Sequence, residues 1–511
     1  MPGGRAQHEN RRGRNSSPII GRRPGLSTRG RALRFRDVEA TALPRWRVFP
    51  ALALGTIMAV LDISVVNIAL PTLSRFFDVP LTTIEWVVLA YVLTITGLLL
   101  TLGRLADLVG RRRVYGWGLA VFTVASALCA AAPSAALLVA ARALQGLGAA
   151  MMTANSAAML ISSFPAEERG RALGAFGAMV GVGLALGPPV GGLLVGHLSW
   201  RWIFLINLPI GLLAQWQLRT RVPADPPGHP TSLSLAGAAL WCGALTALML
   251  GLSRGPAHGW GDPSVWPAFA LAAVLFAGFA LDEARSRHPL LPLDLLRGPL
   301  GASTTLTMLA NGLSISVGFH LPLYLEEVLR FDAAKSGRWL AVMPLIALFL
   351  APVAGRWSDR FGPRPLLVGG MLLAAAGFAV MSQVGIAPHP AQILGGMALI
   401  GVGMGLFSVP NSSAVMSSVP ADRLGLASGL QATMRNLGIA GGAAAMTAVV
   451  SSRFAAHGGG MLAASPRGAA AHPLAFALAT RDAYLAMAAV AVLALLLAAL
   501  PPARAAETRE G

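Results

Sequence analysis

Long apolar runs alternate with short polar loops along most of the chain, beginning at Val48. A helix needs about 20 apolar residues to cross about 30 Å of hydrocarbon, and fourteen of these runs reach or approach that length. Every backbone amide must be hydrogen-bonded within the segment inside a bilayer, so each run is expected to be helical. The pattern therefore predicts an all-α integral membrane protein. The approximate limits of the fourteen predicted transmembrane helices are 48–70, 84–103, 114–132, 135–160, 172–196, 202–217, 233–252, 265–281, 301–325, 337–355, 365–384, 391–416, 425–450 and 482–500.

Basic residues are distributed unevenly over the loops that join these runs. With the N-terminus inside, most of the 40 lysine and arginine residues fall on the inner side, and the bias persists without the N-terminal tail. Loops rich in lysine and arginine remain in the cytoplasm. We therefore expect a multi-pass protein of the plasma (inner) membrane with both termini cytoplasmic.

The two ends of the chain differ in character from its middle. Residues 1–46 are polar, contain pairs of arginines and lack the apolar core of a cleavable signal peptide. They are expected to form a disordered basic cytoplasmic tail, with a partner-binding arm as the alternative. Residues 501–511 are expected to form a second, shorter cytoplasmic tail.

The chain also repeats part of its own sequence. The loop 103–112 recurs 252 residues later as 355–364, and the segment 165–170 has a counterpart at 420–425. Parallel repeats of this kind place a ligand site between the two halves, near the middle of the membrane. The predicted organisation is a six-helix bundle at 47–217, a linker with two extra transmembrane helices at 218–298, and a second six-helix bundle at 299–500.

Composition narrows the possible functions. The 511 residues are 55% hydrophobic and only 12% charged, which excludes a soluble domain of this length. The net charge of +18 does not indicate nucleic-acid binding, since the basic residues are spread over the loops and the tail. Cys129 and Cys242 lie in separate apolar runs, so neither a disulfide framework nor a metal site is expected. The sequence has no phosphate-binding loop, HExxH zinc motif or convincing nucleophile–base set, so we expect neither an ATP-driven pump nor an enzyme.

Two loops carry the first recognisable motif. The segment 103–113, G-R-L-A-D-L-V-G-R-R-R, resembles a signature of major facilitator transporters, and 355–364 repeats it. The resemblance implies the major facilitator fold. Asp107 suits a neighbouring helix N-terminus and the arginines hold the loop at the cytoplasmic face, although a basic turn that serves only orientation is the alternative. The residues expected to act in gating from these two loops are Gly103, Asp107, Arg111, Gly355, Asp359 and Arg360.

The fifth run contains a glycine-rich stretch that is typical of a helix packed closely against another. Gly183, Gly187 and Gly191 recur every four residues and share a face, while Pro188 and the proline after it should bend the helix. With Gly192 these residues resemble a further signature of the superfamily, G-x-x-x-G-P-x-x-G-G, which is typical of antiporters. We expect the stretch to act as a hinge. The alternative is a kink that serves packing alone.

Other segments resemble the fourteen-helix drug:proton antiporters, the multidrug efflux type of this superfamily. The segment 61–71, L-D-I-S-V-V-N-I-A-L-P, is similar to the motif of their first helix, and 200–211 is similar to the entry to their sixth. The resemblance covers nearly the whole membrane portion, 48–500. It implies efflux that confers resistance to antibiotics and other toxic compounds.

Asp62 and Arg142 are the charged residues expected to couple transport to protons. From the helical rise, Asp62 lies roughly 12 Å and Arg142 roughly 10 Å below the same outer surface, so the two can pair. The segment 138–148 around Arg142 resembles the superfamily signature that is linked to proton coupling. An arginine favours the charged form of Asp62 and burial opposes it, so a substrate that alters the pair can drive proton binding or release. The alternative is that Asp62 bonds only to local backbone or to Asn67.

Several other polar or aromatic residues within the runs are candidates for lining a substrate cavity. Trp86 and Tyr91 could stack on flat cations, although Trp86 also suits an interfacial belt. His320 could titrate or hold an interface, and Arg435 could pair structurally or bind a substrate or ion. The full set of cavity candidates is Asn67, Trp86, Tyr91, Gln145, His320, Gln431 and Arg435.

Together these features predict a monomeric secondary active transporter that exports hydrophobic or cationic drugs in exchange for protons. Its expected partners are a small-molecule substrate, protons and the lipid bilayer, with no nucleic acid. The proton gradient takes the place of a cofactor as the energy source. Two other hypotheses stay open: a dedicated exporter of a self-made metabolite or natural product, and, more remotely, a membrane sensor that does not transport.

Overall fold

The chain falls into two units, Met1–Pro44 and Arg45–Gly511, and only the second is described below. The predicted tails lie outside the described residues, except for Arg45 and Trp46. The computed structural model describes residues 45–79, 81–165, 168–223, 234–258, 260–286, 289–331, 333–385, 388–458 and 472–500.

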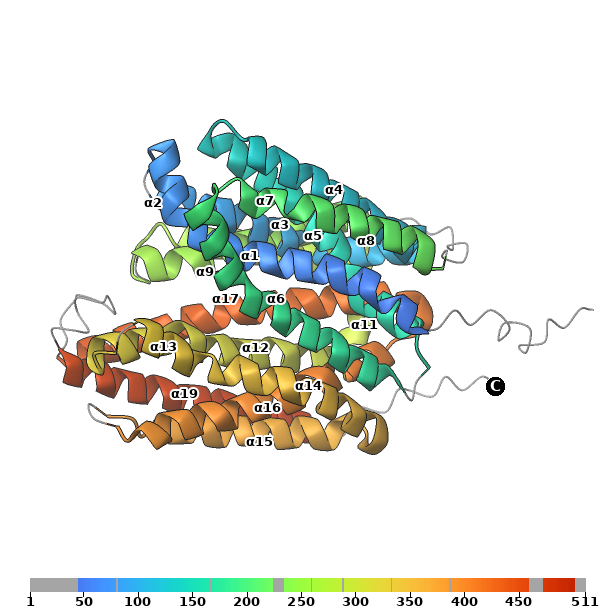
Figure 1. Ribbon diagram of the computed structural model, residues 1–511. Helices are drawn as coiled ribbons and strands as arrows, with labels where there is room; N and C mark the ends of the chain where they lie inside the picture. Colours follow the sequence, from blue (N-terminus) through green and yellow to red (C-terminus); the bar gives the residue numbers. More distant parts are fainter. Residues whose placement is uncertain are drawn as a thin grey trace, which may run out of the picture. The chain divides into compact units, whose positions relative to one another are not determined.

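The first half of the membrane unit is a bundle of six long helices, seen in the upper part of Figure 1. Within it the first helix packs on the fifth and sixth, and the second and third both pack on the fourth. These helices are α1 (Phe49–Phe77), α3 (Trp86–Val109), α4 (Arg111–Ala131), α5 (Ala135–Ser162), α6 (Arg169–His197) and α8 (Asn207–Arg221), joined by the short α2 (Leu81–Ile84) and α7 (Trp202–Leu205).

Two helices follow the first bundle, α9 (Leu235–His258) and α10 (Trp266–Arg285). They pack on each other, and Trp241 of α9 contacts Phe276 and Phe279 of α10. Of the two, α9 also contacts α3 in the first half and α17 in the second.

The second half repeats the arrangement and forms the lower part of Figure 1. Its helices are α11 (Leu293–Leu296), α12 (Pro299–Leu323), α13 (Ala333–Leu340), α14 (Val342–Phe361), α15 (Pro363–Met381), α16 (Pro390–Ser417), α17 (Leu424–Ala456) and α19 (Pro473–Ala499). Prolines stand in the first turn of α12, α15, α16 and α19, where the missing backbone N–H costs no hydrogen bond.

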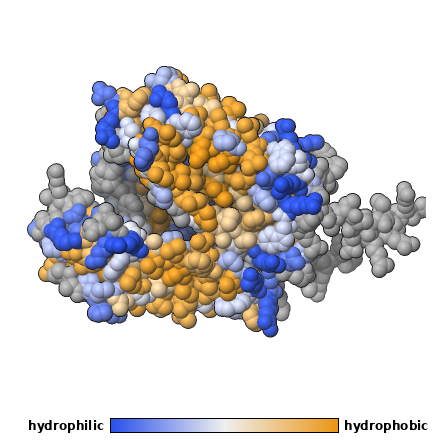
Figure 2. Space-filling model, in the orientation of Figure 1, coloured by the Kyte–Doolittle hydropathy of each residue, from blue (hydrophilic) through white to orange (hydrophobic). Residues whose placement is uncertain are grey.

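Among the described residues, 12 helices are long and apolar enough to cross a membrane. The predicted segments 172–196 and 202–217 are helical in α6, α7 and α8, but they are not among these 12. The total of fourteen therefore stays a prediction. Figure 2 shows apolar residues over the middle of one face and hydrophilic residues toward its ends, as a membrane protein requires.

Several helices are longer than the apolar runs that predicted them, and two of them differ most. The first continues to Phe77, past the predicted end at 70, and α19 begins at Pro473, before the predicted start at 482. The early start was missed because Arg481 and Asp482 interrupt the apolar pattern. In the fold Asp482 accepts a hydrogen bond from His457 at 3.0 Å, so its charge is compensated beside the end of α17.

The two halves reproduce one another in local detail. Gly110 and Gly362 precede α4 and α15 with φ of 114° and 78°, a conformation that side chains with a Cβ rarely adopt. Arg112 donates to the carbonyl of Arg219 at the end of α8, and its counterpart Arg364 donates to the carbonyl of Ala499 at the end of α19. The repeated loops thus make matching contacts in both halves, while the exact domain limits stay a prediction.

Candidate proton-coupling and gating sites

Asp62 and Arg142 form a buried ion pair between α1 and α5. Asp62 lies near the middle of α1 and Arg142 lies two turns into α5, and neither side chain is exposed. The Nη1 of Arg142 donates to Oδ2 of Asp62 at 2.5 Å. The contact expected from their matching depths is therefore formed, whereas the role of the pair in coupling stays a prediction.

Two amides complete the environment of the Asp62 carboxylate. Gln145 of α5 and Asn207 of α8 donate to its Oδ1 at 2.9 and 3.1 Å. Gln145 also accepts from Nη1 of Arg142 at 2.7 Å, so acid, amide and guanidinium form one network. Asn67, the partner named by the alternative hypothesis, is exposed and is not among these donors.

Arg142 makes further contacts that hold its guanidinium in place. Its Nε donates to the carbonyl of Val87 at 2.9 Å, and its Cζ lies 4.1 Å from the centre of the Tyr91 ring. Tyr91 is fully buried and donates to the carbonyl of Ala59 at 3.3 Å. In this conformation Tyr91 therefore stabilises Arg142 and presents no ring face to a cationic substrate.

Protonation of Asp62 would change the balance of this network. A buried charge is stable only when it is paired and hydrogen-bonded. A neutral Asp62 would leave the guanidinium of Arg142 without its carboxylate, in a site that α4 closes through Ser126, whose hydroxyl accepts from Gln145 at 2.8 Å. Protonation of Asp62 would thus be linked to the packing of α1 against α5 and α8.

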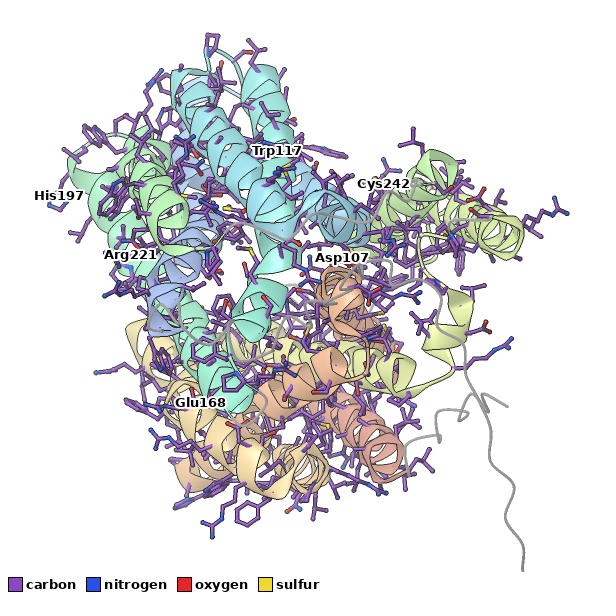
Figure 3. All side chains as sticks on the ribbon, turned by 90° about the vertical axis from the view of Figure 1, so that its right-hand side faces the viewer. Asp107, Trp117, Glu168, His197, Arg221 and Cys242 are labelled. Atoms are coloured by element: carbon purple, nitrogen blue, oxygen red, sulfur yellow. The ribbon has the colours of Figure 1, made fainter. Side chains whose placement is uncertain are left out.

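A second group of polar contacts joins the two halves where α17 begins. Asp107, near the end of α3, accepts from the backbone N–H groups of Gly425 and Leu426 at 2.9 and 2.8 Å. Arg111 donates to Asp107 at 2.8 Å and to the carbonyl of Ala421 at 2.6 Å. The carboxylate therefore satisfies the free N–H groups and the positive end of a helix from the other half (Figure 3).

The repeated loop makes the same contact in the opposite sense. Asp359 of α14 accepts from the backbone N–H groups of Gly170 and Arg171, which begin α6, at 2.8 and 3.0 Å. Arg360, predicted to act beside it, is exposed and lies over the ring of Phe361. Asp107 and Asp359 thus form a pair of related contacts between the halves, which we call the interhalf contacts.

Glycine allows the helices to approach closely at both interhalf contacts. A Cβ on Gly103 would collide with the carbonyl of Gly425, and one on Gly355 would collide with that of Gly170. Small residues at such crossings let two membrane helices come into backbone contact. Gly103 and Gly355, the predicted gating glycines of the repeated loops, therefore lie where the halves meet.

The glycine-rich stretch of α6 packs on α1. A Cβ on Gly187 would collide with the side chain of Ser64, and Cβ atoms on Gly183 and Gly191 would contact Val60 and Val65. A Cβ at Gly192 would meet nothing within 4 Å, so that glycine is not part of the packed face.

The predicted bend of this helix is less evident than its packing. The helix α6 continues through both prolines without a break in its helical assignment. The side chain of Pro188 lies outside the described part of the chain. The glycines thus have an observed packing role, while the hinge stays a prediction.

Each end of α6 contacts a different half. Gly170 and Gly174 lie against Gly355 and Ala351 of α14, whereas Gly183, Gly187 and Gly191 lie against α1. Figure 1 shows α6 crossing obliquely from the lower bundle to the upper one. The helix α17 is its counterpart: it contacts α3 at Gly425 and α12 near Gly438.

The remaining cavity candidates do not share one site. His320 is buried and lies 2.9 Å from the hydroxyl of Thr480, as an interface histidine would. Gln431 donates to Ser412 of α16 at 2.8 Å, and the exposed Arg435 follows it one turn later on α17. Trp86, which is 38% exposed, opens α3. Gln145 belongs to the buried Asp62 network and does not line a surface.

Comparison with known proteins agrees with this architecture. The sequence matches the Major Facilitator Superfamily over residues 52–443. The chain belongs to the major facilitator superfamily. It is therefore a multi-pass membrane transporter, and its family is not one of enzymes.

Several relatives of this major facilitator transporter are resistance or export proteins. The methylenomycin A resistance protein of Streptomyces coelicolor is 37% identical over 79% of this chain and 85% of its own length. The tetracenomycin C resistance and export protein of Streptomyces glaucescens is 35% identical over 80% of this chain and 76% of its own. The human organic anion transporter MFSD10 shares the fold, with a TM-score of 0.61 and 17% identity over 89% of this chain and 99% of its own.

Asn207 is the main member of the Asp62 network that the sequence reasoning missed. It lies in the segment 200–211 that resembles the antiporter family, so a signal was present. Nothing in local spacing indicates that residues 62 and 207, 145 positions apart, meet in the fold. Ser126 and Cys129, on α4, were missed for the same reason.

Proposed function

We propose that this transporter is a proton-coupled antiporter that exports hydrophobic or cationic toxic compounds across the plasma membrane. Both chain termini lie in the cytoplasm, and a single chain suffices for transport. The expulsion of antibiotics follows from this activity. The names of the resistance and export relatives support the export of antibiotics.

The observation that carries the proposal is the buried network around Asp62. It contains a titratable acid that no solvent reaches, paired with Arg142 and bonded by amides from two helices. Ionisable residues within membrane helices are costly to insert and mark proton or substrate pathways. Asp62 is therefore the proposed proton carrier, and Arg142 is the residue whose positive charge favours the ionised form of Asp62.

The proposed energy source is the proton gradient, with no cofactor. Moving one charge across 100 mV is worth about 2.3 kcal/mol, so the proton potential can sustain a substrate gradient without ATP. In the proposed cycle, Asp62 binds a proton from outside and releases it to the cytoplasm after a conformational change. The interhalf contacts open and close the cytoplasmic path in turn.

Drug-driven proton movement tests this assignment. Everted membrane vesicles are energised to acidify their interior, and an acridine dye reports the pH gradient while ethidium is added. The unaltered protein is expected to release protons on ethidium addition. Asp62→Asn is expected to abolish the release, because the amide cannot carry a proton between the two sides.

Asp78→Asn is the matched control for this experiment. The control replaces an aspartate of α1 by asparagine as well, but at the C-terminal cap of the helix. Asp78 has a φ of 52° there, a conformation that asparagine also adopts. It should leave proton release intact. Undiminished release in Asp62→Asn would remove Asp62 from the role of proton carrier.

A dedicated exporter of one natural product is the second candidate function. It is favoured by the names of the two relatives, each of which specifies a single compound. Growth of an efflux-deficient host on a panel of toxic compounds separates the two: broad resistance supports multidrug export, and resistance to one compound supports the dedicated exporter.

A further inference from the structure

Arg435 occupies an unusual position on α17. It is an exposed cation 11 residues into a membrane helix, and it forms no ion pair or hydrogen bond with any residue in the described parts of the chain. Arg142, by contrast, has its charge compensated by Asp62. An intramembrane charge without a protein partner is best explained by a ligand that binds it transiently.

The side chain of Arg435 faces the space between the two halves. Asn436 donates to Thr96 of α3 at 3.0 Å, and Gln431, one turn before Arg435, donates to Ser412 of α16 at 2.8 Å. Since α3 belongs to the first half and α16 to the second, the face that bears Arg435 has protein on both sides. Its exposure is therefore to an internal space and not to lipid.

This space closes in one direction along α17 and opens in the other. Ser428 and Ala432, seven and three residues before Arg435 on the same side of the helix, are buried. Ile439, one turn after it, is 39% exposed. Figure 2 shows the surface hollowed between the halves on the side where α2 and α13 lie. Arg435 thus lies at the closed end of a space that opens away from the interhalf contacts.

We propose that Arg435 binds an acidic group of the substrate, such as a carboxylate or a phenolate. This inference rests on the proposed function and adds to its cargo hydrophobic compounds that carry an anionic oxygen. A guanidinium binds such oxygens through two parallel, charge-assisted hydrogen bonds. Asp62, the buried acid of the network, is already bonded to Arg142, whereas Arg435 has no acid bound to it in the described part of the chain.

Three probes that share a naphthalene ring and carry a negative, a neutral or a positive group test the proposal: 2-naphthoate, 2-naphthalenemethanol and 2-naphthylmethylammonium. Equilibrium dialysis measures their binding to the purified full-length protein in detergent, with protein-free micelles as the blank. The unaltered protein is expected to bind naphthoate about tenfold or more tightly than the alcohol, because only the acid pairs with Arg435. The ammonium compound should bind weakest.

Variants at Arg435 decide whether this preference comes from the guanidinium. Arg435→Gln is expected to reduce naphthoate binding to the level of the alcohol and to leave alcohol binding unchanged. Arg435→Lys keeps the charge and should retain part of the preference. An unchanged melting temperature of each variant in the same detergent shows that the fold is intact.

Two results would overturn the proposal. One is naphthoate binding that does not exceed that of the alcohol in the unaltered protein, and the other is a preference that survives in Arg435→Gln. Neither result tests the role of Asp62 as proton carrier, since the proton release that follows ethidium addition is measured separately. Conversely, an Arg435-dependent preference without substrate-driven proton movement would contradict antiport and leave the acid-binding site standing.

Discussion

The Asp62 carboxylate accepts three side-chain hydrogen bonds from two helices other than its own. The ion pair with Arg142 was predictable from the sequence, because the helical rise gives both residues the same depth. The contact with Asn207 was not, because its donor comes from a distant helix whose rotation about its axis the sequence does not determine. Tyr91, predicted as a cavity candidate, is buried against Arg142 in this structure. The apolar pattern places it in the membrane but does not say which face it occupies.

Removing one partner of the ion pair should cost more stability than removing both. Arg142→Ala leaves the Asp62 charge buried without its cation, which costs about 3–5 kcal/mol for pairs of this kind. The double variant Asp62→Asn with Arg142→Gln contains no buried charge. We therefore expect the melting temperature in detergent to fall in the order unaltered protein, double variant, Arg142→Ala.

Both variants should lose substrate-driven proton movement, since each lacks the titrating pair. A melting temperature of Arg142→Ala at or above that of the double variant would mean that Asp62 and Arg142 do not stabilise the fold as a charged pair.

The helix α6 is an element shared between the two halves. Its first turns lie against α14, and its later turns lie against α1. The glycine spacing of the sequence predicted that α6 has a closely packed face. It did not predict that α6 packs on two different helices, because the crossing of the helices determines which ones it contacts. A helix that contacts one half at one end and the other half at the other end must slide or rotate when the halves move.

A side chain at Gly187 is expected to damage transport without preventing membrane insertion. The added Cβ of Gly187→Ala would collide with Ser64, and overpacking of this kind costs about 1–3 kcal/mol. We expect substrate-driven proton release to fall while the amount of protein in the membrane stays unchanged.

Two companion variants make this result specific to the α1–α6 contact. Gly192→Ala introduces the same group where a Cβ has no neighbour within 4 Å, so it should be silent. Ser64→Gly combined with Gly187→Ala removes the colliding side chain and should restore part of the activity. Full activity of Gly187→Ala would mean that the glycine face is not required for movement.

At the scale of the whole molecule, the halves are joined by α3 against α17 and by α14 against α6. Asp107 and Asp359 cap helices of the opposite half at these two places. The duplication in the sequence predicted that the two loops correspond. It did not indicate that each loop binds the other half, since a repeat carries no information about which copies meet.

Loss of one interhalf contact should open the path from the cytoplasm. Hydrogen bonds to a charged group are worth about 1.5–3 kcal/mol, so Asp107→Ala should raise the open population by about tenfold or more. A cysteine at the buried Ser428, in a protein whose Cys129 and Cys242 are replaced by alanine, reports this opening. Its reaction with a charged thiol reagent in everted vesicles should become faster by a similar factor.

Asp294→Ala is the control for this measurement, because Asp294 is a highly exposed acid on α11 and its ion pair with Arg297 is also solvent-exposed. It should leave the reaction rate of the cysteine unchanged. If the cysteine at position 428 reacts at the same rate with and without Asp107→Ala, the carboxylate does not hold the halves together.

The two interhalf contacts are related by duplication, but they are not chemically equal. Arg111 bridges Asp107 and the carbonyl of Ala421, whereas the residue 252 positions later is Pro363, whose ring offers no donor. Separation of α3 from α17 therefore also breaks the charge-assisted hydrogen bond from Arg111 to Ala421. Because the two contacts are built differently, they are expected to release one after the other, which would turn a symmetric rocking motion into an ordered, two-step motion with an asymmetric intermediate.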